Sequence, residues 1–191
     1  MRAPLLALLL AASLPGVNAR ADVDIGGIRY ASTVKLDGQA LPLNGVGTQF
    51  NKVGSRSFSV AVYALAKSGS ASELLAMPGP KRIVFKFMRP VQADAMRFLT
   101  KGIEANLERA DSIKTINGVV RLGSLLGGRA GFSDGDSLAL DYLPGKGTVL
   151  AINGKPQGEP VAEPEFFKAM LLVWVGVKPF DPKMKTGILG G

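Results

Sequence analysis

The 191-residue sequence contains no cysteine and no histidine. Without cysteine, no disulfide can form and no lipoprotein-type lipid anchor is possible, so the fold must be held by its core. The two absences also exclude the usual zinc sites and the nucleophile systems in which histidine is the base. Acid–base chemistry would fall to Asp, Glu, Lys, Tyr or bound water. We expect no metal site and no cofactor.

Acidic residues are also scarce, since 15 Asp and Glu face 23 Lys and Arg, for a formal net charge of +8. A basic surface can meet anionic lipid head groups or another anionic ligand. The basic residues are scattered, and only one Trp and three Tyr could stack on bases. We therefore expect no nucleic-acid partner.

The sequence lacks an apolar run of the ~20 residues that a membrane span needs. Its longest run, residues 5–14, follows Met1-Arg2 and precedes Pro15-Gly16 and Ala19-Arg20-Ala21. This order is typical of a cleaved secretory signal peptide, here residues 1–21, with cleavage after Ala21 or alternatively Ala19. The remaining 170 residues, 22–191, would be one exported, periplasmic domain with a net charge of +6.

Alternating and helical periodicities indicate an α+β domain with a mostly antiparallel sheet covered by helices. Turn signals stand at Asp37-Gly38, at residues 144–147 and at Asn153-Gly154, and residues 44–47 are expected to be a glycine-rich link. The expected strands are 28–36, 40–43, 58–66, 81–88, 138–143 and 148–152. The expected helices are 70–77, 91–107, 111 or 112 to 126, and 165–175. In the third helix, the predicted buried stripe is Ile113, Ile116, Val120 and Leu125.

Several strings, taken in order, resemble the bacterial, exported branch of the chalcone isomerase-like family. The resemblance covers the chain from about Ile25 onward and implies an open-faced β-sandwich, in which helices pack on a large sheet and leave a cleft. The strings are Leu43 to Gly47, Val60 to Tyr63, Gly79 to Ile83, Asp134 to Asp136, Tyr142 to Thr148, Val149 to Lys155, Phe166 to Gly176, Pro179 and Leu189-Gly190.

The family's plant enzymes close a flavanone ring, using an arginine for the substrate anion and a threonine and a tyrosine to order a water. Read without a gap, the resemblance places the arginine position at Gln49 and the threonine position at Ala61. Gln carries no charge and Ala donates no hydrogen bond, and no Tyr lies between Tyr63 and Tyr142. The catalytic pattern is therefore dismantled. Arg56 or Lys52 could enter the cleft instead, although we interpret both as solvated loop cations.

Non-catalytic members of the family bind fatty acids in the same cleft, so the resemblance implies an apolar or amphipathic ligand. The candidate ligand-binding residues are Gln49, Ala61, Val62, Phe85, Phe87, Met88, Met170 and Trp174. The alternative interpretation of the apolar candidates is that they are ordinary core residues.

Other polar residues have structural interpretations. Asp134 and Asp136 fit a turn, Glu163 and Glu165 fit a helix N-terminus, and Lys146 fits a solvated hairpin. We hypothesise a periplasmic, non-catalytic protein that binds a small amphipathic ligand or a protein partner. The alternatives are an isomerase or intramolecular lyase on another substrate, and an envelope scaffold on anionic lipid. The sequence leaves the oligomeric state open.

Overall fold

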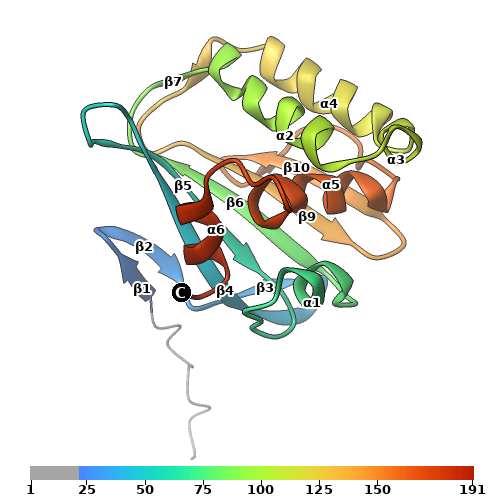
Figure 1. Cartoon of the computed structure of the whole chain (residues 1–191), viewed down its shortest axis with the longest axis horizontal. Coiled ribbons are helices and arrows are strands. Elements are labelled where there is room, and N and C mark those ends of the chain that lie inside the picture. Colours follow the sequence, from blue (N-terminus) through green and yellow to red (C-terminus); the bar gives the residue numbers. More distant parts are fainter. Residues whose placement is uncertain (1–21) are drawn as a thin grey trace, which may run out of the picture.

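The computed structural model describes residues 22–191, so the predicted signal peptide lies outside the described residues. Within this range, a seven-stranded antiparallel sheet in the order β11-β10-β9-β6-β5-β4-β3 forms the body of the molecule (Figure 1). These strands are β3 (Thr33–Leu36), β4 (Gln39–Phe50), β5 (Arg56–Tyr63), β6 (Lys81–Phe87), β9 (Ser137–Leu143), β10 (Gly147–Ile152) and β11 (Lys155–Pro156). The prediction of an α+β domain with a large antiparallel sheet is confirmed.

The helices pack on one face of this sheet, and a separate hairpin lies at the other (Figure 1). The helices are α1 (Ala71–Ala76), α2 (Phe98–Asn106), α3 (Arg109–Ile113), α4 (Ile116–Gly127), α5 (Pro164–Val175) and α6 (Pro182–Ile188), with the 3₁₀ turn η1 (Asp94–Arg97). The hairpin is β1 (Asp22–Ile25) with β2 (Ile28–Ala31), and β7 (Val91–Gln92) pairs with β8 (Gly131–Phe132). In the part of the chain that the structure describes, no helix has the length and apolarity to cross a bilayer.

Strand alternation divides the apolar residues between two cores. Successive residues of β5 and β6 point to opposite faces. Val60, Val62, Ile83 and Phe85 therefore face the helices, where they form the main core with α5. A smaller core on the outer face joins Tyr30, Leu36, Leu41, Leu43, Val46, Ala61 and Tyr63.

The glycine-rich segment 44–47 is a strand and not the predicted link, because its glycines let α6 lie directly on β4. A Cβ at Gly45 would stand 2.3 Å from the Gly187 carbonyl oxygen, and one at Gly47 would stand 2.7 Å from the Met184 Cα. Helix α6 itself was not predicted, although Asp181 caps it and Pro182 begins it.

The two long helices predicted over 91–107 and 111–126 are both interrupted. Residues 91–92 form strand β7, α2 begins at Phe98, and a break at residues 114–115 separates α3 from α4. The predicted buried stripe was wrong, because Ile113, Ile116 and Val120 are 63%, 52% and 61% exposed. Helix α4 is apolar on two sides, and it buries Gly118, Leu122 and Leu126 instead.

Predictions from short-range sequence signals, such as turns and helix starts, are confirmed. Asp37-Gly38 and Asn153-Gly154 have positive φ at both residues and form the predicted two-residue turns. The Asp136 side chain accepts from the Ser133 N–H at 2.7 Å, as a turn aspartate does. Glu163 and Glu165 stand at the start of α5 as expected. Lys146 is exposed but not free, since its Nζ lies 2.8 Å from Asp37 Oδ1 in the turn between β3 and β4.

Candidate functional site

The two positions that the resemblance assigned to one catalytic site lie on opposite faces of the sheet. Gln49 pairs with Phe58 and shares its helix-facing side, whereas Ala61 pairs with Val46 and belongs to the outer core. The turn between β4 and β5 and the irregularity at Gln49/Phe50 set this register. Gln49 and Ala61 therefore do not meet at one site, and the expectation that they share a cleft is corrected.

The other candidate residues lie mostly in the helix-side core. Val62, Phe85, Phe87, Met170 and Trp174 are all at most 2% exposed. Aromatic rings fill the space beside them: Phe98 stacks on Phe58 at a centroid distance of 5.6 Å and lies 4.2 Å from Phe180. Ligand binding by these residues stays a prediction.

Two polar atoms are buried without a hydrogen-bond partner in the region of this aromatic cluster, Gln49 Oε1 and Trp174 Nε1. The Gln49 amide nitrogen is used by its own neighbour, because it donates to the Phe50 carbonyl at 2.9 Å. Gln49 is thus held by the local backbone and brings no charge to the interior.

The remaining candidates lie away from the helix-side core. Met88 lines a hollow between the β4–β5 turn and the β1–β2 turn together with Arg56. Lys52 is exposed in the β4–β5 turn. Neither Arg56 nor Lys52 replaces the family arginine beside Gln49.

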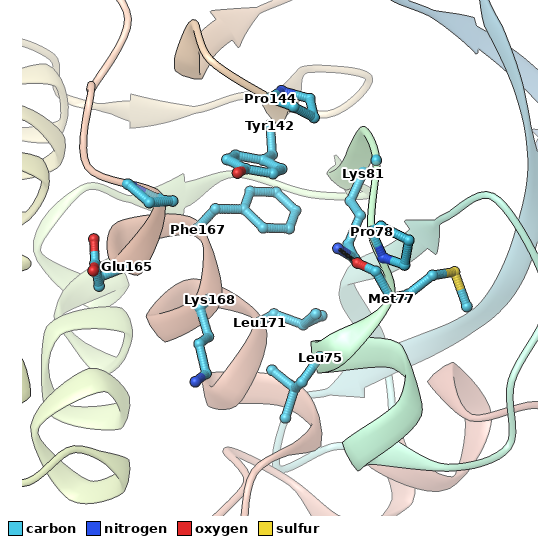
Figure 2. Close-up of a pocket in the computed structure, with 12 residues that line it drawn as sticks. Leu75, Met77, Pro78, Lys81, Tyr142, Pro144, Glu165, Phe167, Lys168 and Leu171 are labelled. Carbon is cyan, nitrogen blue, oxygen red and sulfur yellow. Dashed lines mark hydrogen bonds between the residues drawn. The ribbon is translucent and has the colours of Figure 1, made fainter.

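A pocket of about 330 Å³ opens where α1, the start of β6, the end of β9 and α5 converge (Figure 2). Figure 2 shows the Phe167 ring against the Tyr142 ring, with Lys81 and the segment from Met77 to Pro78 across from them. The two ring centroids are 5.5 Å apart. The lining residues are Leu75, Met77, Pro78, Gly79, Lys81, Tyr142, Pro144, Pro164, Glu165, Phe167, Lys168 and Leu171.

Local sequence signals build the walls of this pocket. Ser70 caps α1, and the segment that follows turns back through Gly79, whose φ of +82° suits glycine. Pro164 begins α5 at a position where its missing N–H costs nothing. These two helix ends leave a gap over the first residue of β6, which is Lys81.

Lys81 places an amine in this apolar pocket. It is 5% exposed, its Nζ donates to the Met77 carbonyl, and it lies 5.8 Å from the Tyr142 ring centroid. Burial lowers its pKa below the usual lysine range. Among residues 22–191, the ion pairs are Arg82–Asp141, Lys114–Asp111, Arg129–Asp136 and Lys146–Asp37, so no carboxylate pairs with Lys81.

An ammonium with unused donors in an apolar pocket can bind an anion that carries an apolar tail. Glu165 and Lys168 on α5 add one charge of each sign to the lining. Within the described part of the chain, no group of three His, Cys, Asp or Glu residues stands close enough to hold a metal ion. The pocket thus offers an amine, one further charge of each sign and apolar contacts to a bound molecule.

Lys81, Tyr142 and Phe167 were not predicted as site residues. The strand over 81–88 alternates, and Lys81 falls in the same phase as the apolar Ile83, Phe85 and Phe87. A lysine in the buried phase of a strand was the available signal.

Comparisons with known proteins agree on the fold. No curated protein sequence matches the chain. A solved structure, the fatty-acid binding protein of Arabidopsis thaliana, is similar with a TM-score of 0.68 and 16% sequence identity, over 88% of this chain and 96% of the plant chain. A family model described as chalcone isomerase-like matches residues 22–190. Because this match covers nearly all of the described residues, the chain belongs to the chalcone isomerase-like family.

Proposed function

We propose that this chalcone isomerase-like domain binds, without catalysis, a small amphipathic anion such as a fatty acid in the Lys81 pocket. The observation that carries the proposal is the buried Lys81 ammonium without a carboxylate partner. A ligand carboxylate would pair with this ammonium in a charge-assisted hydrogen bond. The similar plant protein, which is described as a fatty-acid binding protein, supports this ligand class.

The pocket dimensions favour a short apolar tail. Its volume of about 330 Å³ lies near the lower end of the roughly 300–1,000 Å³ that small-molecule pockets span. Tyr142, Phe167 and Leu171 would cover the first methylene groups of the tail. We therefore expect medium-chain acids to bind better than long-chain acids.

The absence of catalysis is supported by the positions that correspond to the family's arginine and threonine. They hold the neutral Gln49 and Ala61, on opposite faces of the sheet. A preorganised cation for an enolate is not provided by either residue. An assay for chalcone cyclisation should give no turnover above the uncatalysed rate, and turnover that Gln49→Ala abolishes would contradict this part of the proposal.

Calorimetric titration with octanoate, and with octanol as its uncharged counterpart, tests the binding site. We expect the wild-type protein to bind octanoate more tightly than octanol, and Lys81→Met to lose that preference. Lys155→Met removes a charge from an exposed lysine on β11, away from the pocket, and should retain the preference. Equal octanoate affinity in Lys81→Met and wild type would refute the site.

Export is a separate part of the proposal and rests on the signal-like residues 1–21. Cell fractionation followed by intact-mass measurement should find the protein in the periplasm with Asp22 at its N-terminus, or Arg20 if cleavage follows Ala19. A cytoplasmic protein that begins at Met1 would contradict export but not ligand binding.

A further inference from the structure

The turn between β4 and β5 projects from one end of the molecule (Figure 1). Two apolar side chains in this region are exposed to solvent. Phe50 is 50% exposed and Val53 is 82% exposed. Neighbouring apolar side chains on a protruding turn can contribute to a binding surface when charged groups surround them.

Hydrogen bonds to the Asn51 side chain and backbone hold this turn together. Asn51 Oδ1 accepts from the Val53 N–H at 3.1 Å and from the Ser55 N–H at 2.8 Å. The Asn51 N–H donates to the Ser55 carbonyl, and the Gly54 N–H donates to the Asn51 carbonyl. Val53 is therefore held at the crest of a turn whose own hydrogen bonds are made, which lowers the cost of moving it out of water.

Basic residues surround the projecting turn. The hollow of about 490 Å³ beside it is lined by Phe50 and Arg56 from the turn, Gly27 and Ile28 from the β1–β2 turn, and Met88. The three segments that meet here, residues 26–29, 50–56 and 86–89, carry five basic residues and no acidic one. The five are Arg29, Lys52, Arg56, Lys86 and Arg89.

Acidic residues adjoin this region on two sides. In the turn between β8 and β9, the Asp136 carbonyl accepts from the Phe87 N–H at 3.0 Å, and Asp134 is exposed in the same turn. On the other side, the acids lie on β1. Asp24 stands opposite Arg29 in the β1–β2 register, and its Oδ1 accepts from the Gly27 N–H at 2.6 Å. Lys86 is partly occupied, since its Nζ lies 4.6 Å from the Tyr30 ring centroid and donates to the Arg29 carbonyl. Arg56 and Lys52 remain exposed beside Phe50 and Val53.

We propose that this end of the molecule docks on an anionic membrane surface, with Phe50 and Val53 in the headgroup region and Lys52 and Arg56 on lipid phosphates. The exposed apolar side chains suit the interfacial region of a bilayer, and the basic side chains beside them suit its anionic head groups. A flat protein partner of neutral charge would use the apolar side chains but not the exposed cations Lys52 and Arg56. The proposal is independent of ligand binding at Lys81.

Vesicle flotation tests the proposal, with phosphatidylcholine vesicles that contain or lack phosphatidylglycerol. We expect binding only to the vesicles that contain phosphatidylglycerol, and weaker binding as salt rises. A basic residue near an anionic surface contributes about fivefold in affinity. Lys52→Gln with Arg56→Gln should therefore weaken binding roughly 20-fold, and Phe50→Ser with Val53→Ser should weaken it at least as much.

The matched controls sit elsewhere on the surface. Lys155→Gln with Lys183→Gln changes the net charge equally, and Val177→Ser removes a valine that is 93% exposed after α5. Both should bind like wild type. Because every variant shares residues 1–21, differences between variants report the turn and not the leading apolar run.

Three outcomes would overturn the proposal: no binding of wild type, equal loss in the control variants, or equal binding to both vesicle types. Light scattering tests whether the turn binds a second copy of the chain instead. Self-association that Phe50→Ser with Val53→Ser abolishes would assign this end to a second copy of the chain instead of a membrane. If the turn variants still bind octanoate, then membrane docking through the turn and ligand binding at Lys81 are independent properties.

Discussion

Lys81 shows how one residue can be unfavourable for folding and useful for binding. An unpaired ammonium in an apolar pocket gives up part of its hydration, and this is why its pKa falls. A ligand carboxylate would restore the lost interaction. A buried lysine whose pKa is lowered in this way is a candidate binding residue.

The first prediction concerns the stability of Lys81→Met without ligand. At neutral pH we expect this variant to be at least as stable as wild type, because a methionine of similar length removes the buried charge. Native Lys81 loses its proton at a lower pH than the unfolded chain, whose lysines titrate near pKa ~10.4. Between the two pKa values the unfolded state binds more protons, so wild-type stability rises with pH relative to the variant.

Urea unfolding of both proteins at several pH values measures this difference. The gap in the free energy of unfolding should be largest below the native pKa of Lys81 and should close as pH approaches the ordinary lysine value. Lys155→Met, which replaces an exposed lysine, is the control for the loss of one positive charge. A Lys81→Met protein that is markedly less stable at every pH would show that the lysine is structural.

At the scale of elements, close approach decides where glycine is required. Helix α4 contains a matched pair: a Cβ at Gly118 would stand 2.2 Å from the Phe166 ring, whereas a Cβ at Gly123 meets nothing within 4 Å. We expect Gly118→Ala to destabilise the protein by about 1–3 kcal/mol through overpacking. Gly123→Ala should stabilise it by about 0.5–1 kcal/mol, because alanine favours a helix interior.

Thermal or urea unfolding of the two variants gives both values under the same conditions. Equal effects of the two substitutions would contradict the packing of α4 against α5. If Gly118→Ala destabilises the protein and Gly123→Ala has no effect, the contact with Phe166 is still supported. The test is whether Gly118→Ala lowers stability more than Gly123→Ala does.

Elements could be predicted where their signals are local. Strand alternation in β5 and β6 and the Asp37-Gly38 and Asn153-Gly154 turns depend on neighbouring residues, and the structure has them where the sequence indicates them. The single strand predicted over 28–36 was wrong, because β2 and β3 divide it between two sheets. The buried side of α4 could not be predicted, because its sequence is apolar around most of its circumference and only packing against Phe166 selects the side. The register of Gln49 against Ala61 depended on a turn and a strand irregularity, which a fixed spacing of twelve residues does not reveal.

The candidate site was harder to predict for a related reason. Leu75, Lys81, Tyr142 and Phe167 come from four elements that meet only in the folded chain. The sequence alone placed Lys81 on a strand but did not show that the ends of α1 and α5 leave a gap over it. The family resemblance points to a different part of the same helix-facing side, near Gln49, where aromatic rings fill the interior.

At the scale of the whole molecule, β4 joins the two cores. Leu41 and Leu43 in its first half belong to the outer core, and Gly45 and Gly47 further along lie under α6 on the helix side. The ion pair between Lys146 and Asp37 joins the turns at the ends of β9 and β3. Because both cores pack on β4, unfolding of one core would disturb this strand and destabilise the other core.

The last prediction follows from this connection. Leu41 is fully buried in the outer core, so Leu41→Ala should lower the free energy of unfolding by about 2–5 kcal/mol. Trp174 is the one tryptophan of the chain and lies in the helix-side core. If the cores unfold together, tryptophan fluorescence and far-UV circular dichroism should report the same lowered urea midpoint. Val177→Ala on the surface should leave both midpoints unchanged. A Trp174 transition that stays at the wild-type midpoint in Leu41→Ala would show that the outer core unfolds alone.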